Sequence, residues 1–172
     1  VRDELNESAE RRVAILNPIR VVIDNYPEDK EEIFTLPNHP QHPEMGTREV
    51  KFTKDNRTTF TTSQQVFEAN DIKVINDKGS STSNVADYAA PARFYKGSKI
   101  TVAAPGNITT IVFDCNSDSY ATALKNSGLT GTVSVSSDKV TVILDGSSNE
   151  YVISSLTGGQ VRMDSVTVTY LQ

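Results

Sequence analysis

The side chains that could do acid–base, nucleophilic or metal chemistry are few and widely spaced in this sequence. His39 and His42 lie in a stretch that also holds three prolines, and no third ligand is near them. A zinc site needs at least three protein ligands, so this pair predicts turn residues rather than a metal centre. Cys115 ends an apolar run with no histidine in its part of the chain, which predicts a buried structural thiol rather than a nucleophile. The sequence therefore predicts no catalytic residue, no metal site and no cofactor.

Two further clusters have both a functional and a structural interpretation. Asp114, Asn116 and Asp118 supply the hard oxygen ligands that calcium prefers, but the same grouping is typical of Asx turns and a helix cap. Four aromatic side chains could stack on a sugar ring or pack within the fold: Tyr88, Phe94, Tyr95 and Tyr120. We favour the structural interpretation of both clusters, and the absence of tryptophan weakens the case for an aromatic sugar platform.

The composition excludes several classes of protein. The chain has 172 residues, with 17 Lys and Arg against 22 Asp and Glu, so its formal net charge is −5. This balance excludes a generally basic nucleic-acid binder but is compatible with a local basic contact. The single cysteine excludes an internal disulfide. Apolar runs are only a few residues long, so we expect neither a membrane span, which needs about 20 apolar residues, nor a signal peptide.

The distribution of serine and threonine divides the chain into two segments. Residues 1–54 hold four of these side chains, whereas residues 55–172 hold thirty-one. Proline runs the other way, with five in the first segment and two in the second. Such a change predicts two segments of different origin, 1–54 and 55–172, that meet at Lys54-Asp55.

The first segment is predicted to be rich in β-strands. Its β-branched runs predict strands over residues 19–24, 31–36 and 47–53, with a tight turn at Gly46 leading into the third. Three strands leave open edges and bury little apolar surface. If this segment docks on the second one, we expect residues 1–54 alone to be unfolded.

The second segment is predicted to be a jelly roll or β-sandwich, so the chain as a whole is expected to be mainly β. Strands alternate with turn residues such as those at 105–107 and 145–146, at intervals typical of a sandwich. A short helix is expected over residues 119–126, with its cap at 117–119 and Gly128 after its end. The predicted strands are 57–62, 71–76, 92–95, 99–104, 108–114, 131–136, 139–144, 150–155 and 161–171.

Residues 1–53 resemble one stretch of glutaminyl-tRNA synthetase. It is the stretch where the catalytic core and connecting helices pass into the anticodon-binding β-barrels, so the resemblance implies a partial β-barrel-like fold for residues 1–54. The matching pieces stand in the family's order at nearly its spacing, and they are residues 1–6, 13–23, 25–27, 38–40 and 43–52.

This resemblance implies contact with tRNA near the anticodon loop. Asn6 stands at an expected polar contact, Arg11 matches an arginine that reaches the loop, and Gln41 stands where the family often has asparagine. Arginine and amide side chains suit these roles, because they present donors to phosphate and base edges. Glu10 departs from the family's common proline, and its carboxylate would repel phosphate beside Arg11. The ATP-binding motifs of the class are absent, so we expect no charging activity from this chain alone.

The second segment resembles a C-terminal β-sandwich module of surface, secreted and phage-associated proteins of gut bacteria. The pieces that carry this resemblance are residues 92–98, 107–115 and 158–170. It implies an accessory or adhesion role without catalytic residues, for which a glycan or another surface ligand is the partner class.

Three hypotheses follow from these observations. The chain is a synthetase-derived fragment or fusion that keeps a tRNA surface, a non-catalytic binding or adhesion module, or a rearranged frame without evolved activity. The first predicts a cytoplasmic protein and the second a cell-surface or extracellular one, while the oligomeric state is left open.

Overall fold

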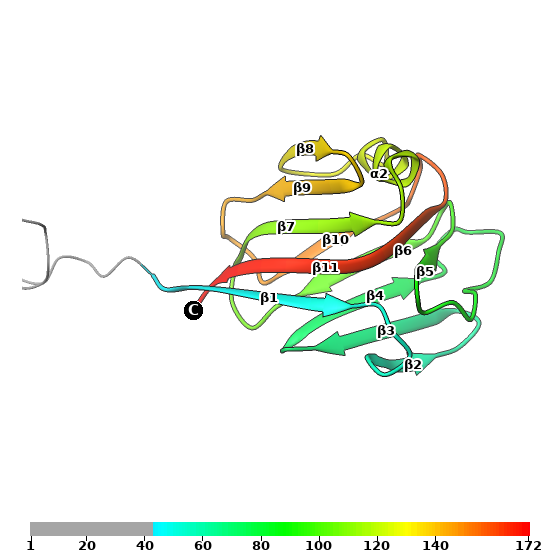
Figure 1. The fold of residues 1–172 in the computed structure, drawn as a ribbon, viewed down its shortest axis with the longest axis horizontal. Helices are drawn as coiled ribbons and strands as arrows, with labels where there is room; N and C mark the ends of the chain where they lie inside the picture. Colours follow the sequence, from blue (N-terminus) through cyan, green and yellow to red (C-terminus); the bar gives the residue numbers. More distant parts are fainter. Residues whose placement is uncertain (1–42) are drawn as a thin grey trace, which may run out of the picture. The chain divides into compact units, whose positions relative to one another are not determined.

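The structure, a computed structural model, describes residues 43–172 (Figure 1). The chain divides into two units, Val1–His42 and Pro43–Gln172, and the described residues are those of the second. The strands predicted at 19–24 and 31–36 lie outside the described residues, as do His39 and His42.

The described unit consists of eleven strands and one short helix. The strands are β1 (Met45–Lys51), β2 (Arg57–Phe60), β3 (Gln64–Ala69), β4 (Ile72–Asp77), β5 (Ala92–Phe94), β6 (Lys99–Ala103), β7 (Ile108–Cys115), β8 (Thr132–Ser136), β9 (Lys139–Ile143), β10 (Glu150–Ile153) and β11 (Val161–Leu171), and the helix is α2 (Asp118–Lys125). No helix in this part of the chain has the length and apolar character that crossing a bilayer requires.

The strands form two antiparallel sheets. Sheet A has the order β1-β11-β7-β9-β8, with β5 also paired to β11, and sheet B has the order β10-β6-β4-β3-β2. Side chains of both sheets join in one buried cluster, with Phe113 and Val166 from sheet A and Phe67 and Val102 from sheet B. The mainly β prediction is confirmed. Within residues 43–172 the architecture is a two-sheet sandwich and not a closed barrel, and the jelly-roll connection stays a prediction.

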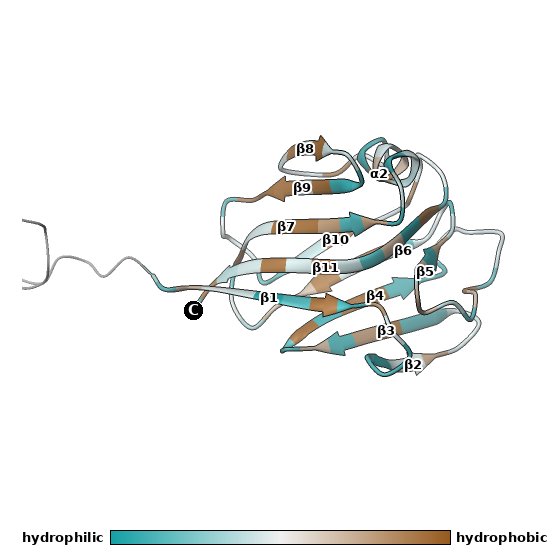
Figure 2. Cartoon of the chain, in the orientation of Figure 1, coloured by the Kyte–Doolittle hydropathy of each residue, from teal (hydrophilic) through white to brown (hydrophobic). Residues whose placement is uncertain are grey.

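Alternation of apolar and polar residues explains most of these strands (Figure 2). In β9, Val140 and Val142 are buried between more exposed neighbours. The longest strand, β11, changes its alternation midway, because its pairing with β7 shifts register between Met163 and Ser165. A bulge of this kind inserts one extra residue into a strand. Odd-numbered residues therefore face the core before the bulge, and even-numbered residues face it afterwards.

Strand β1 joins the synthetase-like segment to the sandwich. It pairs with β11 from Met45–Leu171 to Lys51–Ser165, and just beyond it the Phe52 amide donates a hydrogen bond to the Asp164 carbonyl at 2.8 Å. The strand predicted over 47–53 is therefore confirmed, with an earlier start. The turn predicted at Gly46 is wrong: Gly46 lies within β1, and a Cβ there would come within 2.9 Å of the Tyr170 ring.

The change of composition at Lys54-Asp55 falls inside this compact unit. It lies in the turn between β1 and β2, where the Arg57 amide bonds to the Lys54 carbonyl and the Asn56 side chain bonds to the Lys51 carbonyl. The two compact units of the chain meet at His42-Pro43 instead. A change of sequence origin at 54–55 stays a prediction, since folding as one unit says nothing about ancestry.

Strand β3 was not predicted. Its sequence lacks alternation, because Gln65, Val66 and Phe67 are buried in succession. Gln, Glu and Ala also favour helices over strands, so the local propensity of this segment opposes a strand. The segment is extended because it pairs with β2 on one side and β4 on the other. Tertiary pairing overrides the local signal here.

The predicted helix is confirmed as α2. Ser117 occupies the N-cap position, and Gly128 follows the helix end with a φ of +70°, a conformation that glycine adopts without strain. Ala121 and Leu124 are buried on the face that contacts sheet A. The helix thus closes one end of that sheet.

Candidate functional site

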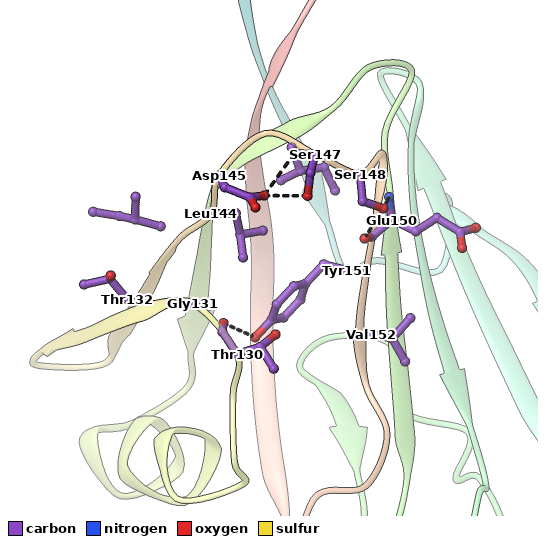
Figure 3. Close-up of a pocket in the computed structure, with 12 residues that line it drawn as sticks. Thr130, Gly131, Thr132, Leu144, Asp145, Ser147, Ser148, Glu150, Tyr151 and Val152 are labelled. Carbon is purple, nitrogen blue, oxygen red and sulfur yellow. Dashed lines mark hydrogen bonds between the residues drawn. The ribbon is translucent and has the colours of Figure 1, made fainter.

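An open groove lies where the edges of the two sheets separate (Figure 3). It has a volume of about 670 Å³ and is formed by β10 of sheet B, the end of β9 and the segment before β8. We call it the edge groove. Its lining residues are Ile108, Thr130, Gly131, Thr132, Ile143, Leu144, Asp145, Ser147, Ser148, Glu150, Tyr151 and Val152.

One end of the edge groove is held together by Tyr151. Its ring is buried, and its hydroxyl donates a hydrogen bond to the Thr130 carbonyl at 3.0 Å, as Figure 3 shows. Burial raises the pKa of Tyr151 above its ordinary value, so the phenol stays a neutral donor. This bond ties β10 to the loop before β8 and fixes the width of the groove.

The other end of the groove carries an ordered acidic turn. Asp145 Oδ1 accepts hydrogen bonds from the Ser147 hydroxyl at 2.6 Å and the Ser147 amide at 3.0 Å. The Ser147 hydroxyl, and then its amide, lower the pKa of Asp145, so the carboxylate is a pure acceptor near neutral pH. Ser148 caps the start of β10 by bonding to the Glu150 amide.

Apolar side chains complete the edge groove. Ile143 is 53 % exposed and Val152 is 42 % exposed, values that are high for large aliphatic residues. The lining has no histidine, cysteine, lysine or arginine, and its polar groups are hydroxyls, carboxylates and backbone atoms. The arrangement suits binding of a ligand with an apolar face and hydroxyl donors.

The three residues predicted to contact tRNA, Asn6, Arg11 and Gln41, lie outside the described residues, and their roles stay predictions. The edge groove was not predicted. Asp145 and Gly146 were interpreted only as turn residues, and nothing in the sequence indicates that Tyr151 would reach Thr130.

The residues with alternative interpretations have structural partners. Cys115 is buried, as predicted, and burial raises the pKa of its thiol to about 12. Asp114 pairs with Lys139 at 2.7 Å, and Asp118 accepts a hydrogen bond from Ser137. Asn116 donates to Asp164 at 3.2 Å.

Within residues 43–172 no group of three or more His, Cys, Asp or Glu side chains is arranged to hold a metal ion.

The aromatic residues divide between core and surface. Phe94 is fully buried, whereas Tyr88 is 49 % exposed, and Tyr95 and Tyr120 are partly buried. Core or edge packing, the favoured interpretation, is confirmed for Phe94 and stays a prediction for the three tyrosines.

Comparison with known proteins supports the synthetase resemblance. Residues 9–86 match the family model described as "tRNA synthetases class I (E and Q), anti-codon binding domain". Over 55 residues the chain is 53 % identical to a glutamine–tRNA ligase of Pseudoalteromonas atlantica, 56 % to that of Aliivibrio fischeri and 58 % to that of Proteus mirabilis. No solved structure matches the chain.

The similarity is confined to part of each protein. The 55 residues are 32 % of this chain and 10 % of each ligase, so the chain matches about a tenth of the length of these relatives. The family match continues to residue 86, beyond the 53 residues of the predicted resemblance, and so includes β1 to β4. Residues 9–86 are therefore similar to an anticodon-binding domain of this family, while the resemblance of residues 60–171 to a gut-bacterial module stays a prediction.

Proposed function

We propose that the chain is a fusion that binds tRNA through its synthetase-like residues and has no charging activity of its own. The observation that carries this proposal is the 53–58 % identity to glutamine–tRNA ligases over 55 residues. The matched family is described by anticodon binding, and the chain holds Asn6, Arg11 and Gln41 at positions that suit RNA contacts. The absence of charging is supported by the short match, which covers a tenth of each ligase.

A binding measurement on the full chain tests the tRNA contact. We expect a transcript of tRNA for glutamine to bind with an affinity that falls as salt rises, because phosphate contacts release counterions. Arg11→Ala should weaken binding by roughly ten- to a hundredfold, since a charge-assisted hydrogen bond contributes about 1.5–3 kcal/mol. Lys125→Ala is the control, because Lys125 is an exposed cation of α2 outside the matched residues 9–86, and it should change affinity less than twofold.

Two outcomes would contradict the tRNA proposal: no binding by the full chain at low salt, or an equal loss for Arg11→Ala and Lys125→Ala. Formation of glutaminyl-tRNA by the chain in the presence of ATP and glutamine would contradict the absence of charging.

A second candidate function is supported by the edge groove. We propose that the sandwich is a non-catalytic binding module of a surface or phage-associated protein, and that its groove takes a neutral sugar. Carboxylate oxygens and hydroxyls beside exposed Ile143 and Val152 match the hydroxyls and the apolar face of a sugar ring. We expect the wild-type protein to be retained on a glycan array. Asp145→Ala should lose this retention, whereas Asp55→Ala, a control in an exposed turn, should keep it. Retention that is unchanged in Asp145→Ala would contradict it.

A further inference from the structure

Two arginines lie directly opposite each other on neighbouring strands of sheet A. Arg93 of β5 pairs in register with Arg162 of β11, and the residues on either side of each, such as Ala92 and Met163, point into the core. Because side chains alternate along a strand, both arginines share the outer face of the sheet. Like charges directly opposite on antiparallel strands repel, so this pairing is unfavourable by itself.

Three tyrosines surround the two arginines. The Arg93 guanidinium lies 3.9 Å from the centre of the Tyr88 ring and forms a long hydrogen bond, 3.5 Å, with the Tyr95 hydroxyl. Arg162 lies 5.6 Å from the centre of the Tyr120 ring. These five residues form what we call the arginine–tyrosine cluster. It lies where β5 meets the start of β11, at the α2 end of sheet A (Figure 1).

The positive charge of the cluster is not neutralised within the described part of the chain. Neither Arg93 nor Arg162 has a carboxylate within 4 Å among residues 43–172. The acidic residues nearest in sequence are engaged elsewhere: Asp87 pairs with Arg57 at 2.7 Å, and Asp164 accepts from Asn116. The Nε atoms of both arginines are buried without a hydrogen-bond partner in this part of the chain. Two guanidinium groups are thus held by aromatic contacts while most of their donors are unused.

We propose that the arginine–tyrosine cluster binds a small molecule carrying a phosphate or sulfate monoester. A tetrahedral oxyanion placed over the two arginines would accept hydrogen bonds from both guanidinium groups and cancel their repulsion. The exposed ring of Tyr88 would contact the body of the ligand. A nucleic-acid strand suits the surface less well, because residues 43–172 hold twelve Lys and Arg against thirteen Asp and Glu, and a polyanion needs a broad basic surface.

Titration of the full chain at fixed ionic strength tests this site. The probes are phenyl phosphate, phenyl sulfate and phenol, and binding is followed by two-dimensional NMR of the backbone amides. We expect shifts centred on β5 and the start of β11 with one or both oxyanions, and binding of phenol at least roughly tenfold weaker because it lacks the charge. The oxyanion that binds more tightly shows whether the natural ligand carries a phosphate or a sulfate monoester. No saturable shift at these strands with either oxyanion would overturn the proposal.

Substitutions distinguish binding at the arginine–tyrosine cluster from nonspecific attraction of anions to the protein. Arg162→Gln should weaken binding of the preferred oxyanion roughly tenfold, whereas the matched control Arg48→Gln, on the exposed surface of β1, should change it less than twofold. If Arg162→Gln does not fold, Arg162→Lys keeps the charge and should show intermediate affinity because the planar fork is lost. Equal affinity in wild type and the Arg162 variant would overturn the site. Displacement of phenyl phosphate by tRNA would also overturn it, because the ligand would then be a nucleic acid.

Discussion

The strands β1 and β7 flank the same strand, β11, and have very different sequences. β7 buries four side chains in the core, namely Ile108, Ile111, Phe113 and Cys115. β1 comes from the synthetase-like segment and buries only Gly46 and Val50 within its own length, together with Phe52 just beyond it. Both strands nevertheless pair with β11 over most of its length, β1 in a continuous register and β7 with register shifts at Met163/Ser165 and Thr169/Tyr170.

This comparison shows that an edge strand needs few apolar residues to belong to a sheet. The backbone hydrogen bonds of β1 are the same as those of any antiparallel strand, and its charged residues face solvent at the margin of sheet A. Phe52 secures its end, because its ring lies 4.7 Å from Phe67 and 5.7 Å from Phe94. Composition therefore separates the two segments more sharply than the fold does.

The largest expected effect is on this anchor. Phe52→Ala in the full chain should lower the free energy of unfolding by about 3–5 kcal/mol, because it removes a ring that is only 2 % exposed from a packed core. Urea unfolding followed by circular dichroism measures the change. Phe60→Ala is the matched control: Phe60 is 38 % exposed on β2, and its loss should cost less than about 1 kcal/mol. A loss for Phe52→Ala no larger than that for Phe60→Ala would contradict the role of Phe52 as the anchor at the end of β1.

The next effect concerns the end of β7. Burial raises the pKa of Cys115 to about 12 from an ordinary value of 9.0, so the folded protein keeps this proton at pH values where the unfolded chain releases it. The contribution is fully present below pH 9 and is lost as pH rises toward about 12. The free energy of unfolding should therefore fall by about 1.4 kcal/mol per pH unit over that range.

Urea unfolding at pH 9, 10 and 11 measures this loss, with Cys115→Ala as the reference. The variant lacks the titrating thiol, so its stability should fall less steeply than that of the wild type, whatever the cost of the smaller side chain. Parallel pH profiles for the two proteins would show that the Cys115 thiol is not shielded from water.

The smallest effects are expected for surface pairs on either side of β11. Lys139 of β9 binds Asp114 of β7 at 2.7 Å, and Thr47 of β1 bonds to Thr169 of β11 at 3.0 Å. The ion pair raises the pKa of Lys139, but the lysine side chain is half exposed and the pair is screened by solvent. Lys139→Ala should cost about 0.2–1 kcal/mol at low salt and less in 1 M NaCl, because salt screens exposed charges.

Thermal unfolding of the Lys139 variant at the two salt concentrations measures that difference, and Thr47→Ala provides an uncharged comparison whose cost should not depend on salt. A loss for Lys139→Ala as large as that for Phe52→Ala would contradict the view that buried rings, rather than surface charges, hold these strands.

Much of the fold could be predicted from local patterns. β7 and β9 show regular alternation, and α2 begins at a serine and ends near Gly128, so short windows of sequence contain their signals. β3 could not be found this way, because Gln65 is buried beside Val66 and Phe67. Gly46 was misjudged for a related reason: its role depends on Tyr170, which lies more than a hundred residues away in the chain.

The candidate sites were harder to predict than the fold. The edge groove depends on Tyr151 reaching Thr130, and the arginine–tyrosine cluster depends on Arg93 meeting Arg162. Neither pair shares a local motif. Arg93 and Tyr95 were visible as alternating residues of one short strand, yet nothing in that strand indicates a second arginine opposite it.

The amino-acid sequence by itself determined the class of this protein: a mainly β chain with a buried thiol, whose first part resembles a glutaminyl-tRNA synthetase. Alternation of apolar and polar residues, and the residues that favour turns, act over a few positions, so strands and turns can be predicted from short windows of sequence. Only the tertiary structure decided that residues 45–52 complete a sandwich, that Gln65 enters its interior and that two arginines face each other. These features depend on strand register between distant segments, which is set by packing of the whole core and not by any local sequence.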